Sequence, residues 1–144
     1  MTKTMACGLT AAAILTASVA IAAEKFVVVE RPTDEITTHT HKKPDAAGDI
    51  LTFANPLFDA ANKVATGTDQ GFCLRVVPGK AWECNFTILL KGGQITVEGP
   101  FMDTGDSVFT VLGGTGKYSG AKGAMSLHPL EGKPEALQFS FDLQ

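Results

Sequence analysis

The amino-acid sequence predicts an all-β fold, an eight-stranded antiparallel β-barrel. Short runs of alternating apolar and polar residues recur about every ten residues, and glycine-containing turns separate them. A barrel is favoured over an open sandwich because closure removes the unpaired strand edges. A barrel of about eight strands has an interior that side chains fill, or that holds one small apolar molecule.

Length and composition suit one globular domain. The chain has 144 residues, 44% of them hydrophobic and 19% charged, which is short for two domains and too apolar for a disordered chain. The net charge of −3 argues against a nucleic-acid-binding protein, which normally carries a basic surface. Apart from the N-terminus, no apolar run approaches a membrane-spanning length.

Residues 1–22 have the composition of a cleaved secretory signal. Lys3 supplies a positive charge, Cys7–Ala22 is apolar and uncharged, and Ala20-Ile21-Ala22 is an A-x-A cleavage pattern. An uncleaved membrane anchor is the alternative. We therefore expect a single mature domain of residues 23–144, secreted or periplasmic, in which disulfides are permitted.

The mature domain is expected to begin with a strand followed by a loop. The segment 25–30 (KFVVVE) alternates so that Phe26, Val28 and Glu30 share one face. The stretch 31–48 is polar and interrupted by prolines, which favours a loop.

Residues 45–63 give conflicting signals. Their alanines favour a helix, whereas Pro56 and the turn signals Gly48-Asp49 and Asn55-Pro56 interrupt any regular element. We expect a loop and irregular strand here rather than a helix.

From Gly71 onward the strand signals become regular. Large apolar side chains such as Trp82 and Phe86 alternate with polar ones, as expected of strands with one buried face. The strands expected in this half are 72–77, 81–90, 94–98, 107–112, 118–127 and 136–143.

Two cysteines flank a turn signal in this half. A hairpin with Pro78-Gly79 at its tip would set Cys73 opposite Cys84, with Cβ atoms about 4.5–5.5 Å apart, close to disulfide geometry. A bulge would shift this register, and Pro-Gly is not a favoured two-residue hairpin turn. We expect a Cys73–Cys84 disulfide, with two buried thiols as the alternative.

Four short segments form a recognisable set. They are 48–58 (GDILTFANPLF), 71–73 (GFC), 97–101 (VEGPF) and 111–118 (VLGGTGKY). In this order they resemble the allene oxide cyclase family, and the last is also similar to the glycine-rich segment of dirigent proteins. The resemblance implies an eight-stranded barrel with an apolar cavity and no metal or organic cofactor. In the plant cyclases, which are trimers, such a barrel holds a fatty-acid epoxide while it closes to one stereoisomer.

The resemblance implies roles for three residues. Glu30 matches the family's acid near the end of the first strand, thought to delocalise positive charge as the epoxide opens. Asn55 matches an asparagine that helps hold a water or the epoxide oxygen, although an asparagine before proline is otherwise a turn residue. Cys73 matches a cysteine that lines the pocket. Two positions depart from the family pattern: Pro32 replaces an asparagine, and 37–40 (TTHT) replaces a region with a Ser-Pro pair.

The alternation of the strands adds further pocket candidates. An inward Glu30 needs a partner in an apolar interior, and Arg75, on the same face as Cys73, is the candidate. A solvated carboxylate at the strand end is the alternative. Trp82 and Phe86 are candidates to line the pocket, with simple core packing as the alternative.

Metal and phosphate sites are not expected. His39 and His41 could share a face of an extended chain, and with His128 they could bind zinc, but no acid or thiol pattern supports such a site. We expect solvated loop histidines instead. The run Gly113–Lys117 lacks the residues that a P-loop requires, and turn formation explains its glycines.

These observations give one leading hypothesis and two alternatives. The first is an exported barrel that binds a small hydrophobic molecule, oxylipin-like or phenolic-like, and acts as an isomerase that steers its cyclisation through shape together with Glu30 and Asn55. The alternatives are a non-catalytic carrier of a hydrophobic ligand and a dirigent-type auxiliary that orients radicals made by another enzyme. By resemblance, the protein is expected to form a homotrimer.

Overall fold

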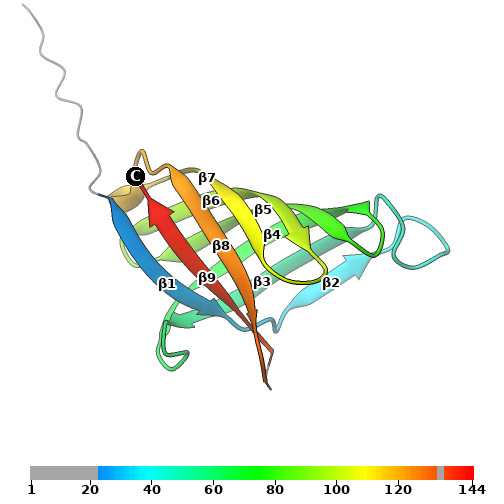
Figure 1. Cartoon of the computed structure of the whole chain (residues 1–144), viewed down its shortest axis with the longest axis horizontal. Helices are drawn as coiled ribbons and strands as arrows, with labels where there is room; N and C mark the ends of the chain where they lie inside the picture. The colour runs from blue at the N-terminus through cyan, green and yellow to red at the C-terminus, as the bar shows by residue number, and fades with distance from the viewer. Residues whose placement is uncertain (1–22, 133–134) are drawn as a thin grey trace, which may run out of the picture.

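The computed structural model describes residues 23–132 and 135–144, and most of them belong to one sheet that closes into a barrel (Figure 1). The expected signal segment, 1–22, lies outside the described residues. Within the described part, no helix is long and apolar enough to cross a membrane. The strands are β1 (Glu24–Glu30), β2 (Glu35–Thr38), β3 (Ile50–Asp59), β4 (Ala65–Val77), β5 (Ala81–Leu90), β6 (Gly93–Met102), β7 (Ser107–Gly114), β8 (Gly123–Leu130) and β9 (Ala136–Leu143).

Eight of these strands form a closed antiparallel ring. Each strand from β3 to β9 pairs with the next, β9 pairs with β1, and β1 pairs with residues 57–59 at the end of β3. The short strand β2 is an addition to the ring and pairs with residues 50–53 of β3. The predicted eight-stranded antiparallel barrel is therefore confirmed.

The strands β1 and β2 cover two halves of the same edge of β3, with a break at residues 31–34 between them. The break lies beside Pro56, whose carbonyl oxygen accepts the Arg31 N–H at 3.2 Å. The N–H and C=O of one strand residue point toward the same neighbouring strand. The N–H that Pro56 lacks would therefore point into the break, so the proline removes no ladder hydrogen bond from β3.

Three segments differ from what the sequence predicts. Residues 45–63 contain the ten-residue strand β3, with one register shift between Leu57 and Phe58; the strand tolerates its proline because the proline coincides with the break. The loop expected over 31–48 contains β2. The strand expected to begin at residue 118 begins only at Gly123, after the single 3₁₀ turn η1 (Gly116–Tyr118).

The turn η1 closes one end of the barrel. Tyr118 is buried there, with its ring centroid 6.0 Å from that of Phe26. Phe26 in turn stacks on Phe141 at 4.6 Å. The backbone N–H of Lys117 donates to the carbonyl oxygen of Gly92 at 2.9 Å and fixes the turn against the β5–β6 connection. This end of the barrel is therefore filled by aromatic side chains.

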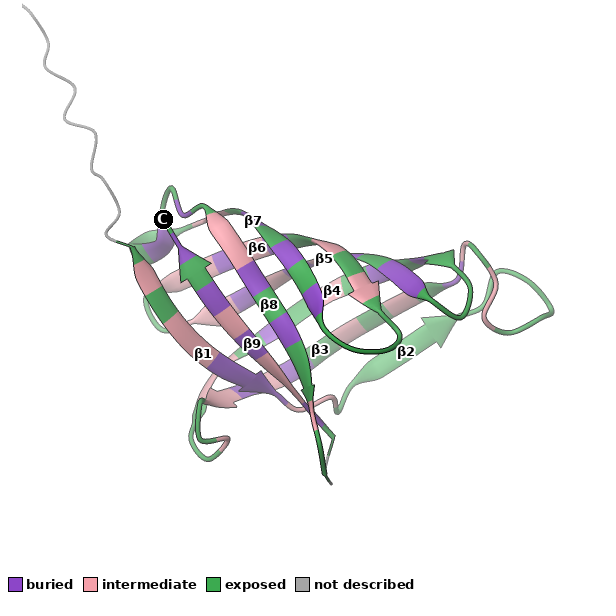
Figure 2. Ribbon diagram, in the orientation of Figure 1, coloured by how far each residue is buried: buried purple, intermediate pink, exposed green. Residues whose placement is uncertain are grey.

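The predicted alternation of buried and exposed residues is present in the strands that form the core. Figure 2 shows buried and exposed segments following one another along β7, β8 and β9. The inward positions of β5 and β9 are occupied by apolar side chains that are nearly all inaccessible to solvent: Trp82, Cys84, Phe86, Ile88, Phe139, Phe141 and Leu143.

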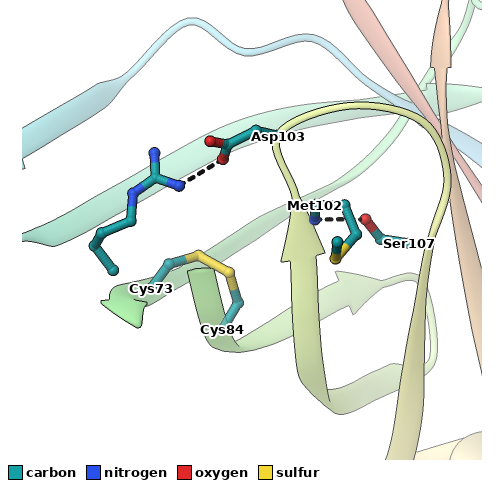
Figure 3. The surroundings of a disulfide bond; sticks show 6 residues. Cys73, Cys84, Met102, Asp103 and Ser107 are labelled. Atoms are coloured by element: carbon teal, nitrogen blue, oxygen red, sulfur yellow. Dashed lines mark hydrogen bonds and ion pairs between the residues drawn. A yellow bond between two sulfur atoms is a disulfide. The ribbon is translucent and has the colours of Figure 1, made fainter. Parts of the chain in front are cut away.

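The hairpin of β4 and β5 contains the predicted disulfide. Cys73 lies opposite Cys84 in the ladder, and the two are bonded (Figure 3). The turn has three residues, Pro78–Lys80, one more than expected. A bulge between Arg75 and Val77 compensates for the extra residue, so the register predicted for the cysteines is retained.

Replacing both cysteines by alanine (Cys73→Ala with Cys84→Ala) should lower the free energy of unfolding by about 3 kcal/mol. The bond joins residues that are 11 apart in the sequence, and opening the loop returns chain entropy to the unfolded state. Urea unfolding of the mature domain, with and without reductant, measures this. Reduced wild type should match the double variant; an unchanged unfolding midpoint would contradict the prediction.

Candidate functional site

The end of the barrel opposite Tyr118 contains a cavity of about 40 Å³. A space of this size holds a few water molecules, whereas a cavity of about 150 Å³ is needed to bind benzene. A ring-sized ligand therefore requires some lining side chains to move. Each strand from β1 to β9 contributes to the wall, which consists of Glu30, Glu35, Leu51, Phe53, Cys73, Cys84, Phe86, Phe101, Phe109, Leu127, Leu137 and Phe139.

Most of this wall is apolar, and Phe86 lies in its middle. Its ring makes edge-to-face contacts with Phe53 and Phe109, at centroid distances of 5.5 and 5.1 Å, and a tilted contact with Phe139 at 5.9 Å. Such pairs hold aromatic rings in defined orientations. The half-buried members of the wall are Leu51, Phe53, Phe101 and Leu137.

Two carboxyl groups interrupt the apolar wall, from either side of the break between β1 and β2. Glu30 ends β1 and is only 3% exposed, whereas Glu35 begins β2 and is exposed. Burial raises the pKa of Glu30 well above its usual value, repulsion from Asp69 adds to this, and a hydrogen bond from Asn55 opposes it. Burial also raises the pKa of Glu35, again against the effect of Asn55.

The side chain of Asn55 connects the break to Glu30. Its Oδ1 accepts the backbone N–H groups of Thr33 at 2.8 Å and of Asp34 at 3.0 Å, both in the break. Since Oδ1 is occupied as an acceptor, Nδ2 is the donor, and it lies 2.5 Å from Oε1 of Glu30. Asn55 is itself buried and is not part of the cavity wall. It therefore holds the carboxyl group that faces the cavity.

A third carboxyl group, that of Asp69, lies on the other side of Asn55. Asp69 is 1% exposed and stands opposite Asn55 in the ladder between β3 and β4. Its Oδ1 accepts the backbone N–H of Asn55 at 3.3 Å, and its Oδ2 has no hydrogen-bond partner among residues 23–132 and 135–144. Burial raises the pKa of Asp69 to about 7; repulsion from Glu35 adds to the effect and the Asn55 N–H opposes it.

The sequence-based analysis missed Asp69 because it started the strand at residue 72. Extending the alternation of Gly71 and Cys73 backward along β4 places residue 69 on the same inner face. The strand begins at Ala65. The alternation that identifies Asp69 as an inward residue is therefore present in the sequence, in the more polar N-terminal half of β4.

Arg75 and Trp82, which were candidates for the pocket, lie outside its wall. The Arg75 guanidinium stacks 3.9 Å above the Trp82 ring. Its Nη1 donates to Oδ1 of Asp103 at 2.6 Å, and its Nε forms an ion pair with Oδ1 of Asp45 at 2.6 Å, without the angle of a hydrogen bond. The expected ion pair between Arg75 and Glu30 does not form, because the guanidinium of Arg75 pairs instead with Asp45 and Asp103, from loops at the rim of the barrel.

Two of the histidines contact carboxylates. His39 lies 2.8 Å from the buried Asp49, and His128 lies 2.6 Å from the exposed Asp106. Hydrogen bonds from His39 and from the backbone lower the pKa of Asp49 well below its usual value. In the described ranges, no three potential ligands are grouped closely enough to hold a metal ion.

The chain matches a known family over almost all of its described residues. A sequence model described as allene oxide cyclase covers residues 25–144. Among solved structures, a pyocyanin demethylase has a TM-score of 0.71 at 22% identity, over 84% of this chain and 100% of that one. The Diels-Alderase AbnU has a TM-score of 0.67 at 15% identity (85% and 98% covered), and the pterocarpan synthase dirigent protein GePTS1 has 0.69 at 11% (90% and 96%). At these identities, the structural likeness shows a shared barrel fold.

Replacing Asn55 by alanine should lower the free energy of unfolding by about 3 kcal/mol, because two backbone N–H groups and a buried carboxyl group each lose a partner. Urea unfolding measures the loss. The matched control is Asn85→Ala in β5, where the amide donates to Glu98 on the exposed face. That variant should change stability by no more than about 0.5 kcal/mol; equal losses in the two variants would contradict the role given to Asn55.

Proposed function

The chain belongs to the allene oxide cyclase family, and we propose that its barrel binds a small hydrophobic molecule and steers that molecule's cyclisation or isomerisation. One observation carries this proposal. Glu30, a buried carboxyl group held by Asn55, faces a cavity whose wall is otherwise almost entirely apolar. The structural likeness to a Diels-Alderase and to a pterocarpan synthase dirigent protein is consistent with chemistry on small molecules.

The apolar wall would contribute through orientation and exclusion of water. Holding a flexible molecule in one folded conformation lowers the entropic part of the barrier to ring closure. A dry cavity also protects a reactive species from hydrolysis. Because the present cavity is small, the half-buried side chains Leu51, Phe53, Phe101 and Leu137 would move aside when the ligand binds.

Within this proposal, Glu30 acts at the reacting atoms and Asn55 positions it. The family resemblance implied that the asparagine helps hold a water or the epoxide oxygen. In this chain the Asn55 amide is instead occupied by Thr33, Asp34 and Glu30. Pro32, which replaces a family asparagine, has no side-chain amide to offer. Glu30 is therefore the group of the wall that we assign to the chemistry.

The charges of the wall restrict the ligand. The wall contains two carboxyl groups and no basic side chain. The nearby Arg75 is engaged with Asp45 and Asp103. A carboxylate of the ligand would lose its hydration in this apolar wall and meet no compensating cation there. We propose that the part of the ligand that enters the cavity is neutral or cationic.

A non-catalytic carrier of a hydrophobic molecule is the second candidate. The dense packing around Phe86 favours it, since a barrel filled by side chains needs no reaction to explain its core. The two functions differ in their dependence on Glu30: a carrier needs only the apolar wall, whereas a cyclase also needs the carboxyl group.

We also propose that the protein acts outside the cytoplasm, as a homotrimer. The disulfide and the N-terminal segment support export. An apolar strip on the outer surface of β2, β3 and β4 supports self-association; it consists of Ile36, Ile50, Phe72 and Leu74, all exposed. Light scattering of the mature domain should give the mass of three chains; the mass of one chain would contradict the trimer.

The catalytic proposal is tested with a freshly made allene oxide as its methyl ester. Wild type should give an excess of one enantiomer of the cyclopentenone, followed by chiral chromatography, whereas buffer gives a racemate. Glu30→Gln should lower the rate by about a hundredfold, as loss of an acid–base group does. Glu83→Gln, an exposed residue of β5, is the matched control and should leave the rate unchanged.

Two results would contradict parts of this proposal. A racemic product from wild type would exclude this substrate class. Equal rates for Glu30→Gln and wild type, with stereoselectivity retained, would leave the barrel as a shape-based template and remove the acid from the chemistry. The free acid of the same allene oxide should react more slowly than the ester, because its carboxylate has no cation in the wall.

A further inference from the structure

Asp69 is a buried carboxyl group that the proposed function does not use. It lies in the interior of β4, between Asn55 on β3 and Ile88 on β5, and is 1% exposed. Among the residues that the structure describes, one donor reaches Oδ1, the Asn55 backbone N–H, and none reaches Oδ2. A carboxylate buried with one long hydrogen bond is costly, so its position calls for an explanation.

No cation in the described ranges 23–132 and 135–144 forms an ion pair with Asp69 or with Glu30. The charged groups that act on them are acids: Glu30 from β1, Glu35 from β2, and Asp69 itself from β4, while β3 and β5 present Asn55 and Ile88. Arg31, the residue that follows Glu30, instead stacks on the Phe58 ring and donates hydrogen bonds to Asn62.

We propose that Asp69 is a positioning residue that acts through Glu30: as a second buried carboxyl group on the far side of Asn55, it keeps the Glu30 carboxyl protonated. The site then presents a hydrogen-bond donor, rather than a carboxylate, to the cavity. This inference rests on the proposed function for its use of Glu30, and it names the partner that sets the proton state of that group.

The physical reason is mutual repulsion in an apolar interior. Two carboxylates on either side of one amide, with no cation beside them, cannot both ionise at low cost, so the pair retains a proton above the pH at which an exposed acid loses it. The direction of the pKa shifts agrees with this geometry, since both groups are raised and Asp69 contributes to the shift of Glu30.

A protonated Glu30 defines the class of ligand. Its O–H can donate to an uncharged acceptor oxygen, such as that of an epoxide, a ketone or a quinone-like carbonyl. When the epoxide C–O bond breaks, its electron pair stays on oxygen, which takes the proton from Glu30. A proton lost from the product then returns to the Glu30 carboxylate, so the protein is unchanged after one turnover.

Carboxyl-carbon NMR titration of the ligand-free mature domain tests the inference without any substrate. Asp69→Asn keeps an oxygen for the Asn55 N–H and removes the charge. We expect the titration midpoint of Glu30 to fall by about one pH unit or more in this variant, a tenfold loss of proton affinity. Glu83→Gln removes a carboxyl group on the outer surface and should leave the midpoint of Glu30 where it is in wild type.

The reciprocal variant tests which of the two acids keeps the proton. Because Glu30 is uncharged while Asp69 titrates, Glu30→Gln should leave the midpoint of Asp69 near its wild-type value of about 7. This measurement keeps the inference testable if Asp69→Asn does not fold. A Glu30 midpoint that is unmoved in Asp69→Asn, an Asp69 midpoint that falls by about one pH unit or more in Glu30→Gln, or a Glu30 that is ionised at neutral pH in wild type would overturn it.

The free energy of unfolding, measured as a function of pH, provides a second test. Asp69 binds its proton more tightly in the folded protein than in the unfolded chain, so wild type should lose stability as the pH rises from about 4, the ordinary aspartate value, to about 7. Asp69→Asn should flatten this dependence; an equally steep loss would count against the inference.

The two proposals can fail separately. If the titrations of Asp69 and Glu30 are coupled but the protein converts no allene oxide, only the proposed function is contradicted. If the protein converts the allene oxide stereoselectively but the two acids titrate independently, only this inference is contradicted.

Discussion

The amide of Asn55 is the contact on which both the wall of the barrel and the acidic part of its cavity depend. A break in a strand leaves backbone N–H groups without ladder partners, and a buried carboxyl group needs a donor. One side chain meets both needs, because its oxygen accepts from Thr33 and Asp34 while its nitrogen donates to Glu30. The geometry of the break and the position of the acid are therefore linked and cannot vary separately.

The buried carboxyl groups that give the site its chemistry also lower the stability of the fold. Three carboxyl groups gather around one neutral amide, where each ionisation is opposed by burial and by its neighbours. The aromatic cluster around Phe86 and the crosslinked hairpin supply stabilisation that does not depend on pH. A site that opposes folding is thus tolerated because the packed rings and the disulfide beside it stabilise the fold.

The parts of this structure that follow from local pattern could be predicted from the sequence, and the parts that depend on distant segments could not. The alternation in β5 and the facing of Cys73 and Cys84 are local. Asn55-Pro56 is locally a turn signal, and only the break between β1 and β2, far earlier in the chain, makes a proline acceptable in mid-strand. For the same reason Arg75 was assigned the wrong partner, since its carboxylates come from loops that no periodicity places.

The two ends of the barrel differ in how freely they can diverge. One is filled by Tyr118 and Phe26, so any change there disturbs the core. The other is bordered by loops whose Asp45 and Asp103 form ion pairs with Arg75, and the Arg75 guanidinium itself stacks on Trp82. Insertions or deletions in those loops can change the entrance of the cavity while the guanidinium of Arg75 still anchors the loops to the barrel. Homologues can thus evolve specificity for different ligands by loop changes that leave the inner carboxyl groups intact.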